Sequence, residues 1–269
     1  GPTGIAAAYF LGREGIPTTI FERERKLGGV PRYVIPAFRI SDEAIDKDVA
    51  LMERLGVEVK CGAPAPSVAE LKKMGYTHIL LATGAWQAGE LGIPGNVRGV
   101  IAWMKEMKQQ VKPCLEGHVV VVGAGNTAMD AARVAKRMGA ASSTIVYRRT
   151  KKEMPADEHE LKLAIDEGVN LVELAAPVEQ KDGKLVCNQM KLGEPDASGR
   201  RSPVATGETF EIPCDLVISA IGEKVDAKLM AENGIEMGRK GPAFQTNVEN
   251  VWSAGDAHSC LLYTSDAAD

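Results

Sequence analysis

The residues best suited to chemistry lie in one stretch of the chain, from His118 to Arg149. The stretch begins with consecutive valines, Val119 to Val122, and such a short apolar run is typical of a strand buried on both faces of a parallel sheet. The glycine turn Gly123-Ala124-Gly125 follows at once, and alanines then recur on one face of a predicted helix. A second apolar strand, residues 144–147, completes the unit. A strand, glycine turn, helix and strand within about 30 residues indicate a dinucleotide-binding unit.

Each position of the turn has its own chemical requirement. Gly123 permits the tight turn out of the strand, and the missing side chain of Gly125 lets the backbone approach a pyrophosphate. Ala128 stands where a small third residue lets the helix pack on the sheet. Asn126 and Thr127 begin that helix, whose free N–H groups and positive dipole end face the anion. We therefore expect Gly123, Gly125, Asn126 and Thr127 to bind the pyrophosphate.

The end of the second strand predicts which dinucleotide binds. An enzyme that uses NAD usually carries an acid there, about 20 residues beyond the last glycine, for the ribose 2′-hydroxyl. This chain has Arg148 and Arg149 instead, and 148 − 125 = 23. Two guanidiniums suit a 2′-phosphate, so the stretch predicts an NADPH site in which Arg148 contributes more than Arg149. The alternative is a buried strand and turn without a ligand, with solvated arginines.

Composition narrows the class of protein. A length of 269 residues allows one large domain or two ordinary ones. A net charge of −4 gives no reason to expect nucleic acid or acidic lipid as a partner, and no apolar run approaches the ~20 residues that span a bilayer. The 5 cysteines are scattered without a C-x-x-C pair, which argues against a disulfide framework, a zinc site or a thioredoxin-type pair. We expect no metal site in this chain, no membrane partner and a cytoplasmic location.

Both ends of the sequence look unnatural. The chain opens at Gly1-Pro2-Thr3-Gly4, which has the spacing of the tail of a second G-x-G-x-x-G turn. We expect the strand before this turn to be missing, and likewise the helix after the last motif. Residues 260–269, CLLYTSDAAD, resemble the translation of a sequencing adapter and are left out of the fold prediction.

A second nucleotide site is predicted after Gly4. An alanine-rich helix runs to Gly15, a strand covers residues 18–21, and Glu22 stands at its end. Here the acid is present, 22 − 4 = 18 residues beyond the last glycine, so this nucleotide carries a free ribose hydroxyl. FAD fits that requirement. A surface acid among neighbouring charges is the alternative role for Glu22.

The remaining chain alternates between short helices and strands. Helices are predicted over residues 42–55, 68–74, 100–111 and 151–169, the last with its acids and bases on a solvated face. Strands are predicted at 57–59, 78–81, 215–222 and 250–257, the last turning at Gly255-Asp256. Residues 171–213 are rich in strand and turn signals, with a hairpin tip at 194–201.

The order of these motifs resembles the NADPH:FAD module of the glutamate synthase small-subunit family, and the flavin–NADPH half of dihydropyrimidine dehydrogenase is similar. The resemblance covers residues 1–259 and is carried by GPTG, Glu22, LGG, IPAFRI, ATG, GAGNTAMD, YRRTKKEMPA, SAIGE and SAGDA. YRRT with EMPA is the most specific part. Within the group, LGEPDASGRR and PVATGET most resemble flavin subunits of the selenate reductase type.

The resemblance implies an α/β fold with two Rossmann-like domains. The FAD-binding domain would comprise residues 1–90 and 226–259, and the NADPH-binding domain, residues 91–225, would be inserted into it. The resemblance also implies an iron–sulfur domain upstream, with [4Fe–4S] clusters outside this sequence as the electron acceptor.

The resemblance further implies where FAD binds. Gly1 and Gly4 would lie at its pyrophosphate, and Glu22 would hold the adenosine ribose. Gly29 would line the flavin side, and Gly255-Asp256 would meet the ribityl chain or its phosphate.

The implied reaction passes hydride from nicotinamide C4 to flavin N5, and electrons then leave one at a time to iron–sulfur centres. The cofactors carry this chemistry, so no catalytic side chain is expected, least of all among His78, His118, His159 and His258. Two alternatives remain open. One is a module that senses NADPH without turnover, and the other is a flavin-free NADP dehydrogenase, which would leave Glu22 and the motifs at either end unexplained.

Overall fold

The computed structural model describes residues 1–195, 201–236 and 244–258. The chain divides into two compact units. The discontinuous unit contains Gly1–Gln87 and Glu223–Asp269, and the continuous unit contains Ala88–Gly222. The chain passes between them in two short paired strands, β4 (Gln87–Ala88) and β13 (Glu223–Lys224).

A parallel sheet of five strands is the frame of the continuous unit. Its order is β5-β12-β6-β7-β8, and all neighbours run parallel. The strands are β5 (Val97–Gly99), β12 (Leu216–Ser219), β6 (His118–Val122), β7 (Ser142–Val146) and β8 (Asn170–Val172). Their last residues are ladder partners in one row: Gly99, Ser219, Val122, Val146 and Val172. The carboxyl ends therefore form one even edge, which is where ligands bind in open α/β sheets.

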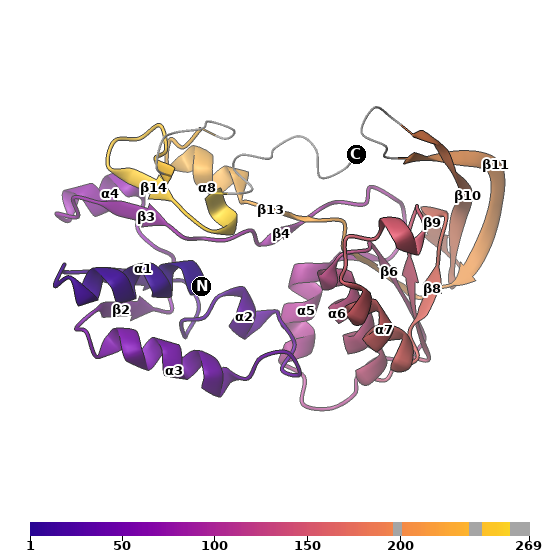
Figure 1. The fold of residues 1–269 in the computed structure, drawn as a ribbon, viewed down its shortest axis with the longest axis horizontal. Coiled ribbons are helices and arrows are strands. Elements are labelled where there is room, and N and C mark those ends of the chain that lie inside the picture. Colours follow the sequence, from indigo (N-terminus) through magenta and orange to yellow (C-terminus); the bar gives the residue numbers. More distant parts are fainter. Residues whose placement is uncertain (196–200, 237–243, 259–269) are drawn as a thin grey trace. The chain divides into compact units, whose positions relative to one another are not determined.

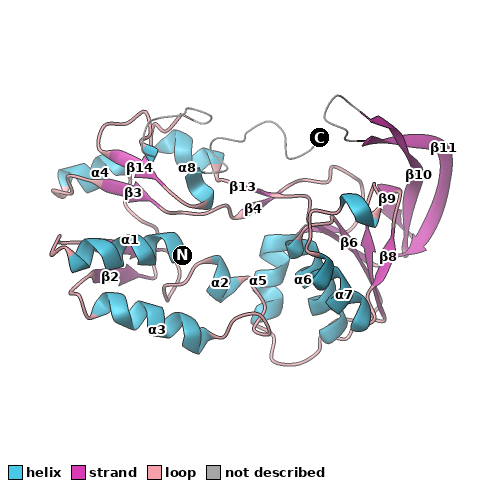
Figure 2. Cartoon of the chain, viewed as in Figure 1, coloured by secondary structure: helices cyan, strands magenta, loops and turns pink. Residues whose placement is uncertain are grey.

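Both faces of this sheet are covered. The helices α5 (Val100–Lys108), α6 (Asn126–Arg137) and α7 (Glu158–Asp166) lie together on one side, as Figure 2 shows. On the other side packs an antiparallel sheet, ordered β11-β10-β9. Its strands are β9 (Ala175–Lys181), β10 (Lys184–Pro195) and β11 (Arg201–Pro213).

The valines of β6 show why its sequence is continuously apolar. Val120 and Val122 pack into a cluster with Leu185 of β10 on the antiparallel-sheet side. Val119 and Val121 point the other way, since side chains alternate along a strand, and they are as fully buried. The predicted burial on both faces is confirmed.

The discontinuous unit contains two separate parallel ladders. In one, β1 (Thr19–Glu22) pairs with β2 (Glu58–Cys61). In the other, β3 (Ile79–Leu81) pairs with β14 (Val251–Ser253), so segments from opposite parts of the chain lie side by side (Figure 1). The helices of this unit are α1 (Pro2–Arg13), α2 (Val30–Tyr33), α3 (Asp42–Glu53), α4 (Val68–Lys73) and α8 (Ala227–Glu232).

Each ladder of the discontinuous unit has its own apolar core. Ile5 and Ala8 of α1 pack with Met52 of α3 in one cluster. Ile79 and Val251, from the second ladder, are buried with α4 and α8 in the other. The serines that precede α3 and α4 accept hydrogen bonds from the first turn of their helices, so both starts are fixed by the sequence.

The structure differs from the sequence prediction over residues 151–169. In place of one helix there is a 3₁₀ turn, Lys151–Glu153, and then α7, which begins only at Glu158. Pro155 disfavours a helical conformation at the residue before it, and Asp157 caps α7, which explains the break.

The charged face of α7 is also less solvated than predicted. Glu167 binds the buried Arg133 of α6 at 2.6 Å and Arg137 at 2.7 Å. These bonds hold the pKa of Glu167 down at about 2.

The structure also bears on the predictions for β5 and for the hairpin. The short strand β5 lies just before the helix predicted over residues 100–111, where the sequence predicted no strand, because three residues carry too little periodicity to reveal one. The predicted hairpin is formed by β10 and β11, while residues 196–200 of its tip lie outside the described residues.

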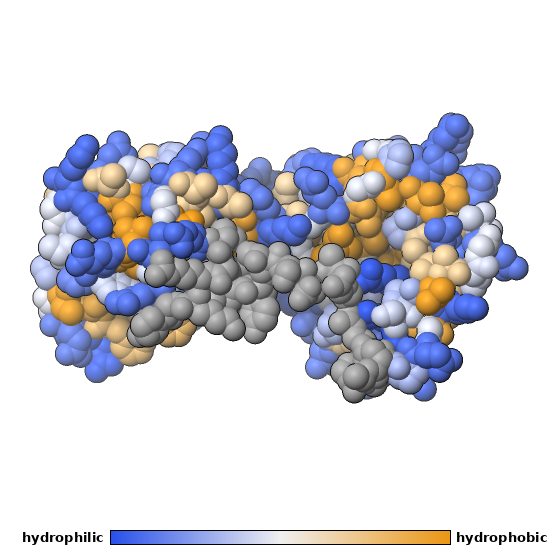
Figure 3. Space-filling model, turned by 90° about the horizontal axis from the view of Figure 1, so that it is seen from above, coloured by the Kyte–Doolittle hydropathy of each residue, from blue (hydrophilic) through white to orange (hydrophobic). Residues whose placement is uncertain are grey.

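The surface seen in Figure 3 is hydrophilic with scattered apolar patches. In the described part of the chain, no helix combines the length and apolar character needed to cross a membrane. Within that same part, no three His, Cys, Asp or Glu side chains gather as metal ligands would. Cys187 and Cys214 are buried free thiols, and burial raises the pKa of Cys187 to about 12.

Candidate functional site

The glycine turn after β6 is locked into the sheet. Gly123 has φ +146°, its N–H donates to the carbonyl of Val146, and the N–H of Ala220 donates to the carbonyl of Val122. A Cβ at Gly123 would overlap the carbonyl oxygen of Ala220. The fold itself therefore requires a glycine at this position.

Gly125 presents the opposite situation. Its φ of −87° is open to any residue, and no atom beyond Gly125 and its two chain neighbours lies within 4 Å of where its Cβ would stand. It is the N-cap of α6, and no side chain caps the helix there. The fold does not require this glycine, so the open space in front of the α6 N-terminus suits an anion that approaches the backbone.

The two arginines that follow β7 differ in burial. Arg148 is exposed, whereas Arg149 is only 8% exposed. The Nε of Arg149 is buried without a hydrogen-bond partner. A buried guanidinium with an unused donor is costly unless a ligand or water meets it, and a phosphate oxygen is a suitable acceptor.

The segment after the arginines returns to the glycine turn. The Thr150 hydroxyl donates to Glu153 at 2.6 Å, and this bond lowers the pKa of Glu153, with the Arg149 charge acting in the same direction. Further on, Ala156 N–H donates to the carbonyl of Ala124 at 3.0 Å. Arg149 thus directly precedes a loop that touches the turn.

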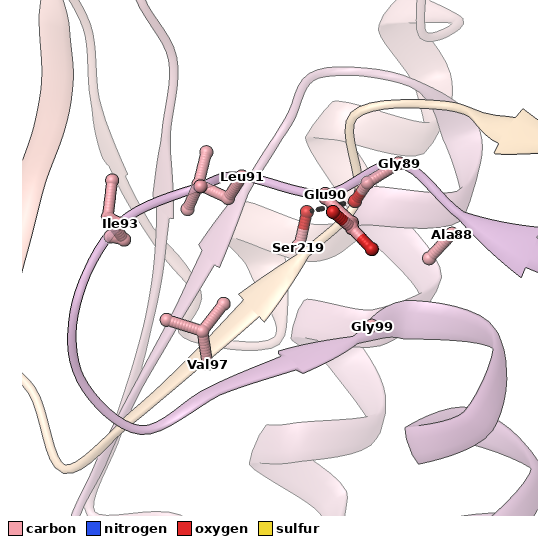
Figure 4. A pocket seen from close by; sticks show the side chains of 9 residues that line it. Ala88, Gly89, Glu90, Leu91, Ile93, Val97, Gly99 and Ser219 are labelled. Carbon is pink, nitrogen blue, oxygen red and sulfur yellow. Dashed lines mark hydrogen bonds between the residues drawn. The ribbon is translucent and has the colours of Figure 1, made fainter.

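A pocket opens at the carboxyl ends of β5 and β12 (Figure 4). It has a volume of about 270 Å³ and lies next to Ala220, which abuts the glycine turn. The Ser219 hydroxyl donates to the carbonyl of Gly89 at 2.8 Å and fixes one wall. Its lining is mostly apolar or glycine, with one carboxylate: Ala88, Gly89, Glu90, Leu91, Gly92, Ile93, Val97, Gly99 and Ser219.

In the discontinuous unit, the residues predicted for FAD gather at the N-terminal end of α1. Gly29 has φ +61°, and a Cβ there would stand 2.6 Å from the Cα of Gly1. Glu22 at the end of β1 places Oε2 3.9 Å from the backbone nitrogen of Gly1. Backbone from two glycine turns and the end of a strand thus meets in one place.

The C-terminal part of this unit reaches the same place. A Cβ at Gly255 would overlap the Thr3 hydroxyl of α1, and Asp256 follows directly at an exposed position. Gly4 lies in the first turn of α1. A Cβ at Gly4 would stand 3.6 Å from the Cβ of Ala82 in the ATG motif, which is an ordinary van der Waals contact. The structure brings together Gly1, Gly4, Glu22, Gly29, Gly255 and Asp256.

Comparison with known proteins shows to which family the chain belongs. The family model of pyridine nucleotide-disulphide oxidoreductases matches residues 1–267. The chain belongs to this family. The oxidoreductase character, the cofactors FAD and NADPH of the family and the predicted NADPH:FAD module group are confirmed.

Several relatives of the family are similar in sequence. The chain is 41% identical over 267 residues to the oxidoreductase YgfK of Escherichia coli K12, covering 95% of this chain and 26% of YgfK. It is 38% identical over 259 residues to the NADPH-Fe(3+) oxidoreductase subunit beta of Geobacter sulfurreducens, covering 88% and 38%. It is 32% identical over 289 residues to the glutamate synthase [NADPH] small chain of Halomonas elongata, covering 95% and 61%. The chain therefore spans about a quarter of the length of YgfK.

Solved structures support the fold. FprA from Mycobacterium tuberculosis in complex with NADPH superposes with a TM-score of 0.76 at 18% identity, covering 97% of this chain and 81% of FprA. The predicted α/β, Rossmann-type fold is confirmed.

Arg32, beside the Gly28–Gly29 turn, makes contacts that sequence reasoning missed. It is 5% exposed, its Nε donates to the carbonyl of Leu27, and it forms ion pairs with Asp42 and Asp46 of α3. It packs against Gly28, where a Cβ would stand 2.7 Å from its own Cβ. Arg32 therefore ties the Gly28–Gly29 turn to α3. An arginine in the apolar string VPRYV, followed by acids at helical spacing, was the available signal.

The histidines make structural contacts. His78 stacks on Trp252, His118 lies 2.8 Å from the Ser142 hydroxyl, and His258 lies 2.9 Å from the Ser253 hydroxyl. His159 is exposed at the start of α7.

Proposed function

We propose that this chain is a module that passes hydride from NADPH to FAD, with NADPH bound by the continuous unit and FAD by the discontinuous unit. The observation that carries the proposal is the contrast between two glycines of one turn. The fold requires Gly123, whereas nothing in the protein occupies the space at Gly125. A small residue that the fold does not need, at an uncapped helix N-terminus, is explained by a ligand that approaches its backbone.

The order of features along the sheet edge supports an extended dinucleotide. The arginines follow β7, the glycine turn follows β6, and the pocket lies at the ends of β12 and β5. These strands are neighbours in that order, so the 2′-phosphate, the pyrophosphate and the nicotinamide would follow one another along the edge. NADPH bound in this way uses the buried donor of Arg149 and places its apolar ring in a mostly apolar pocket.

The discontinuous unit supports FAD through close backbone contacts. Gly29 and Gly255 adopt conformations with positive φ that bring their backbone against residues 1–3, beside the carboxylate of Glu22. In this arrangement Glu22 would accept from the adenosine ribose, and the N-terminus of α1 would face the pyrophosphate. Bound FAD would supply the hydride acceptor and pass electrons on singly.

The rest of the assembly is also part of the proposal. The relatives include an NADPH-Fe(3+) oxidoreductase subunit beta and an NADP(+)-dependent formate dehydrogenase subunit beta, which are named as subunits. We infer an iron–sulfur domain or subunit as the electron acceptor of this chain. The buried free thiols Cys187 and Cys214 fit a reducing compartment, and we place the protein in the cytoplasm.

The deciding experiment follows the visible absorbance of FAD added to the purified chain under anaerobic conditions. We expect NADPH to bleach the flavin at concentrations where NADH does not. If both cofactors bind and no bleaching occurs, the chain is a sensor of NADPH. Saturable NADPH binding without any flavin binding would instead support a flavin-free dehydrogenase.

A further inference from the structure

The residues from Thr150 to Asp157, here called the 150–157 loop, join two parts of the proposed NADPH site. The loop begins directly after Arg149, and its last two residues lie on the glycine turn. Its first half is fixed from within. The Tyr147 hydroxyl donates to the carbonyl of Glu153 at 2.9 Å, and Thr150 donates N–H and O–H to the Glu153 carboxylate.

The last part of the loop is held by the glycine turn. The Asp157 N–H donates to Oδ1 of Asn126 at 3.1 Å, next to the bond from Ala156 to Ala124. Asn126, which the sequence predicts to bind the pyrophosphate, thus also accepts a hydrogen bond from the loop. The side-chain oxygen of Asn126 accepts the bond from Asp157, whereas the bond from Ala156 to Ala124 joins backbone to backbone.

The start of the loop is anchored to Glu173 and Leu174, the two residues that connect β8 to β9. The Leu174 N–H donates to the carbonyl of Arg149 at 3.0 Å, and the Lys151 N–H donates to the Glu173 carboxylate. The loop is thus tied at its start to the connection between β8 and β9 and at its end to Asn126. Arg149 stands at the first of these ties, and the second tie lies at the α6 N-terminus.

We propose that Asn126 is a positioning residue that sets coenzyme preference through the 150–157 loop. The 2′-phosphate and the pyrophosphate are carried by the same ribose, which limits how far apart they can lie, so the two protein sites must keep a separation within that limit. Arg149 is fixed at the start of the loop by the bond from Leu174, and Asn126, through Asp157, fixes the far end of the loop at the glycine turn, so the course of the loop between the two phosphate positions depends on Asn126. The proposal rests on the proposed NADPH site, and it adds a residue that discriminates NADPH from NADH without touching the 2′-phosphate.

The test compares dissociation constants for NADPH and NADH by calorimetry in the wild-type chain and two variants. In Asn126→Ala the loop loses one hydrogen bond, so NADPH affinity should fall about two- to tenfold, while NADH affinity stays within about twofold. Asn126→Asp keeps an acceptor oxygen and should restore the wild-type ratio of the two affinities, although its charge weakens both coenzymes together. His159→Ala, which changes an exposed side chain beyond the loop, should alter neither constant.

A second measurement reports the loop directly. Lys151 and Lys152 are exposed, so trypsin can cleave the loop there. Cleavage should be faster in Asn126→Ala than in the wild type, and Asn126→Asp should behave as the wild type. This readout holds even where coenzyme affinity is too low to measure.

Three results would overturn the proposal. Equal losses for both coenzymes in Asn126→Ala would make Asn126 a direct pyrophosphate ligand. Unchanged constants and unchanged cleavage would show that the loop holds its place without it. If the wild-type chain binds no NADPH, the proposed function fails first and this inference fails with it.

Discussion

The two units build a glycine-rich site in different ways. In the continuous unit the turn at Gly123 extends from the middle strand of five, with ladder neighbours on both sides and covered faces. In the discontinuous unit the glycines belong to three separate segments, and backbone packing against α1 brings them together. The first site inherits its geometry from a sheet, whereas the second depends on a few very close contacts. In the first site, single substitutions should therefore affect either stability or coenzyme binding. In the second site, one substitution should affect both stability and cofactor binding.

The largest effect is expected from the pair Gly123 and Gly125. Gly123→Ala forces a Cβ onto the Ala220 carbonyl and should lower the free energy of unfolding by on the order of 3 kcal/mol. Gly125→Ala should leave stability within about 1 kcal/mol, because its φ suits alanine. The same change should weaken NADPH and NADH alike, about ten- to a hundredfold, by blocking the pyrophosphate.

Urea unfolding and calorimetric titration of both variants test this pair. Near-normal coenzyme affinity in a folded Gly125→Ala protein would show that the turn is not the phosphate site.

The next largest effect concerns the arginines. A buried guanidinium bonds a phosphate in a lower dielectric than an exposed one, so Arg149 should contribute more than Arg148, the reverse of the order expected from the sequence. Arg149→Ala should weaken NADPH binding about ten- to a hundredfold and leave NADH nearly unchanged. Arg148→Ala should have a smaller effect that shrinks further at high salt. Titrations of each variant with NADPH and with NADH at two salt concentrations measure these contributions. Equal losses of affinity for NADPH and NADH would contradict the assignment of the arginines to the 2′-phosphate.

A smaller effect is expected in the discontinuous unit. Gly29→Ala introduces a Cβ 2.6 Å from the Cα of Gly1, so the two turns must separate, and FAD affinity should fall by about tenfold or more. Gly15→Ala is the matched control, since Gly15 also has positive φ but has open space around its Cβ position. Both variants carry similar backbone strain, on the order of 1 kcal/mol. Equal flavin retention in the two proteins, measured by absorbance, would show that the close contact is unimportant.

The smallest effect concerns pH and α6. Glu167 has its pKa lowered to about 2 by hydrogen bonds from Arg137 and Arg133, against an ordinary value of 4.5. A lowered pKa in the folded state stabilises the protein above 4.5, and this contribution disappears as pH falls toward 2. Glu167→Gln should therefore cost about 1 kcal/mol at pH 7, a value that allows for the partial exposure of this carboxylate, and nothing near pH 2. Urea unfolding at both pH values measures the difference, and a constant difference would contradict the ion-pair explanation.

The continuous unit was the more predictable from sequence. Its valine run, glycine spacing and alanine face are local patterns, and each corresponds to β6, the turn and α6. The family followed from the order of such strings. The discontinuous unit was predictable as elements, but its grouping was not, because β3 pairs with a strand about 170 residues later (251 − 79 = 172).

What the sequence determined by itself is the set of local choices: where strands and helices lie, which glycines turn the chain and which charges stand at strand ends. Only the tertiary structure decided that Arg149 is buried, that Arg32 braces a glycine turn and that Asn126 bonds the 150–157 loop. Only there do Gly123 and Gly125 differ, although they look alike in the sequence. The physical reason is that backbone preference and hydrophobic period act over a few residues, whereas burial and close approach depend on atoms that the folded chain brings from elsewhere.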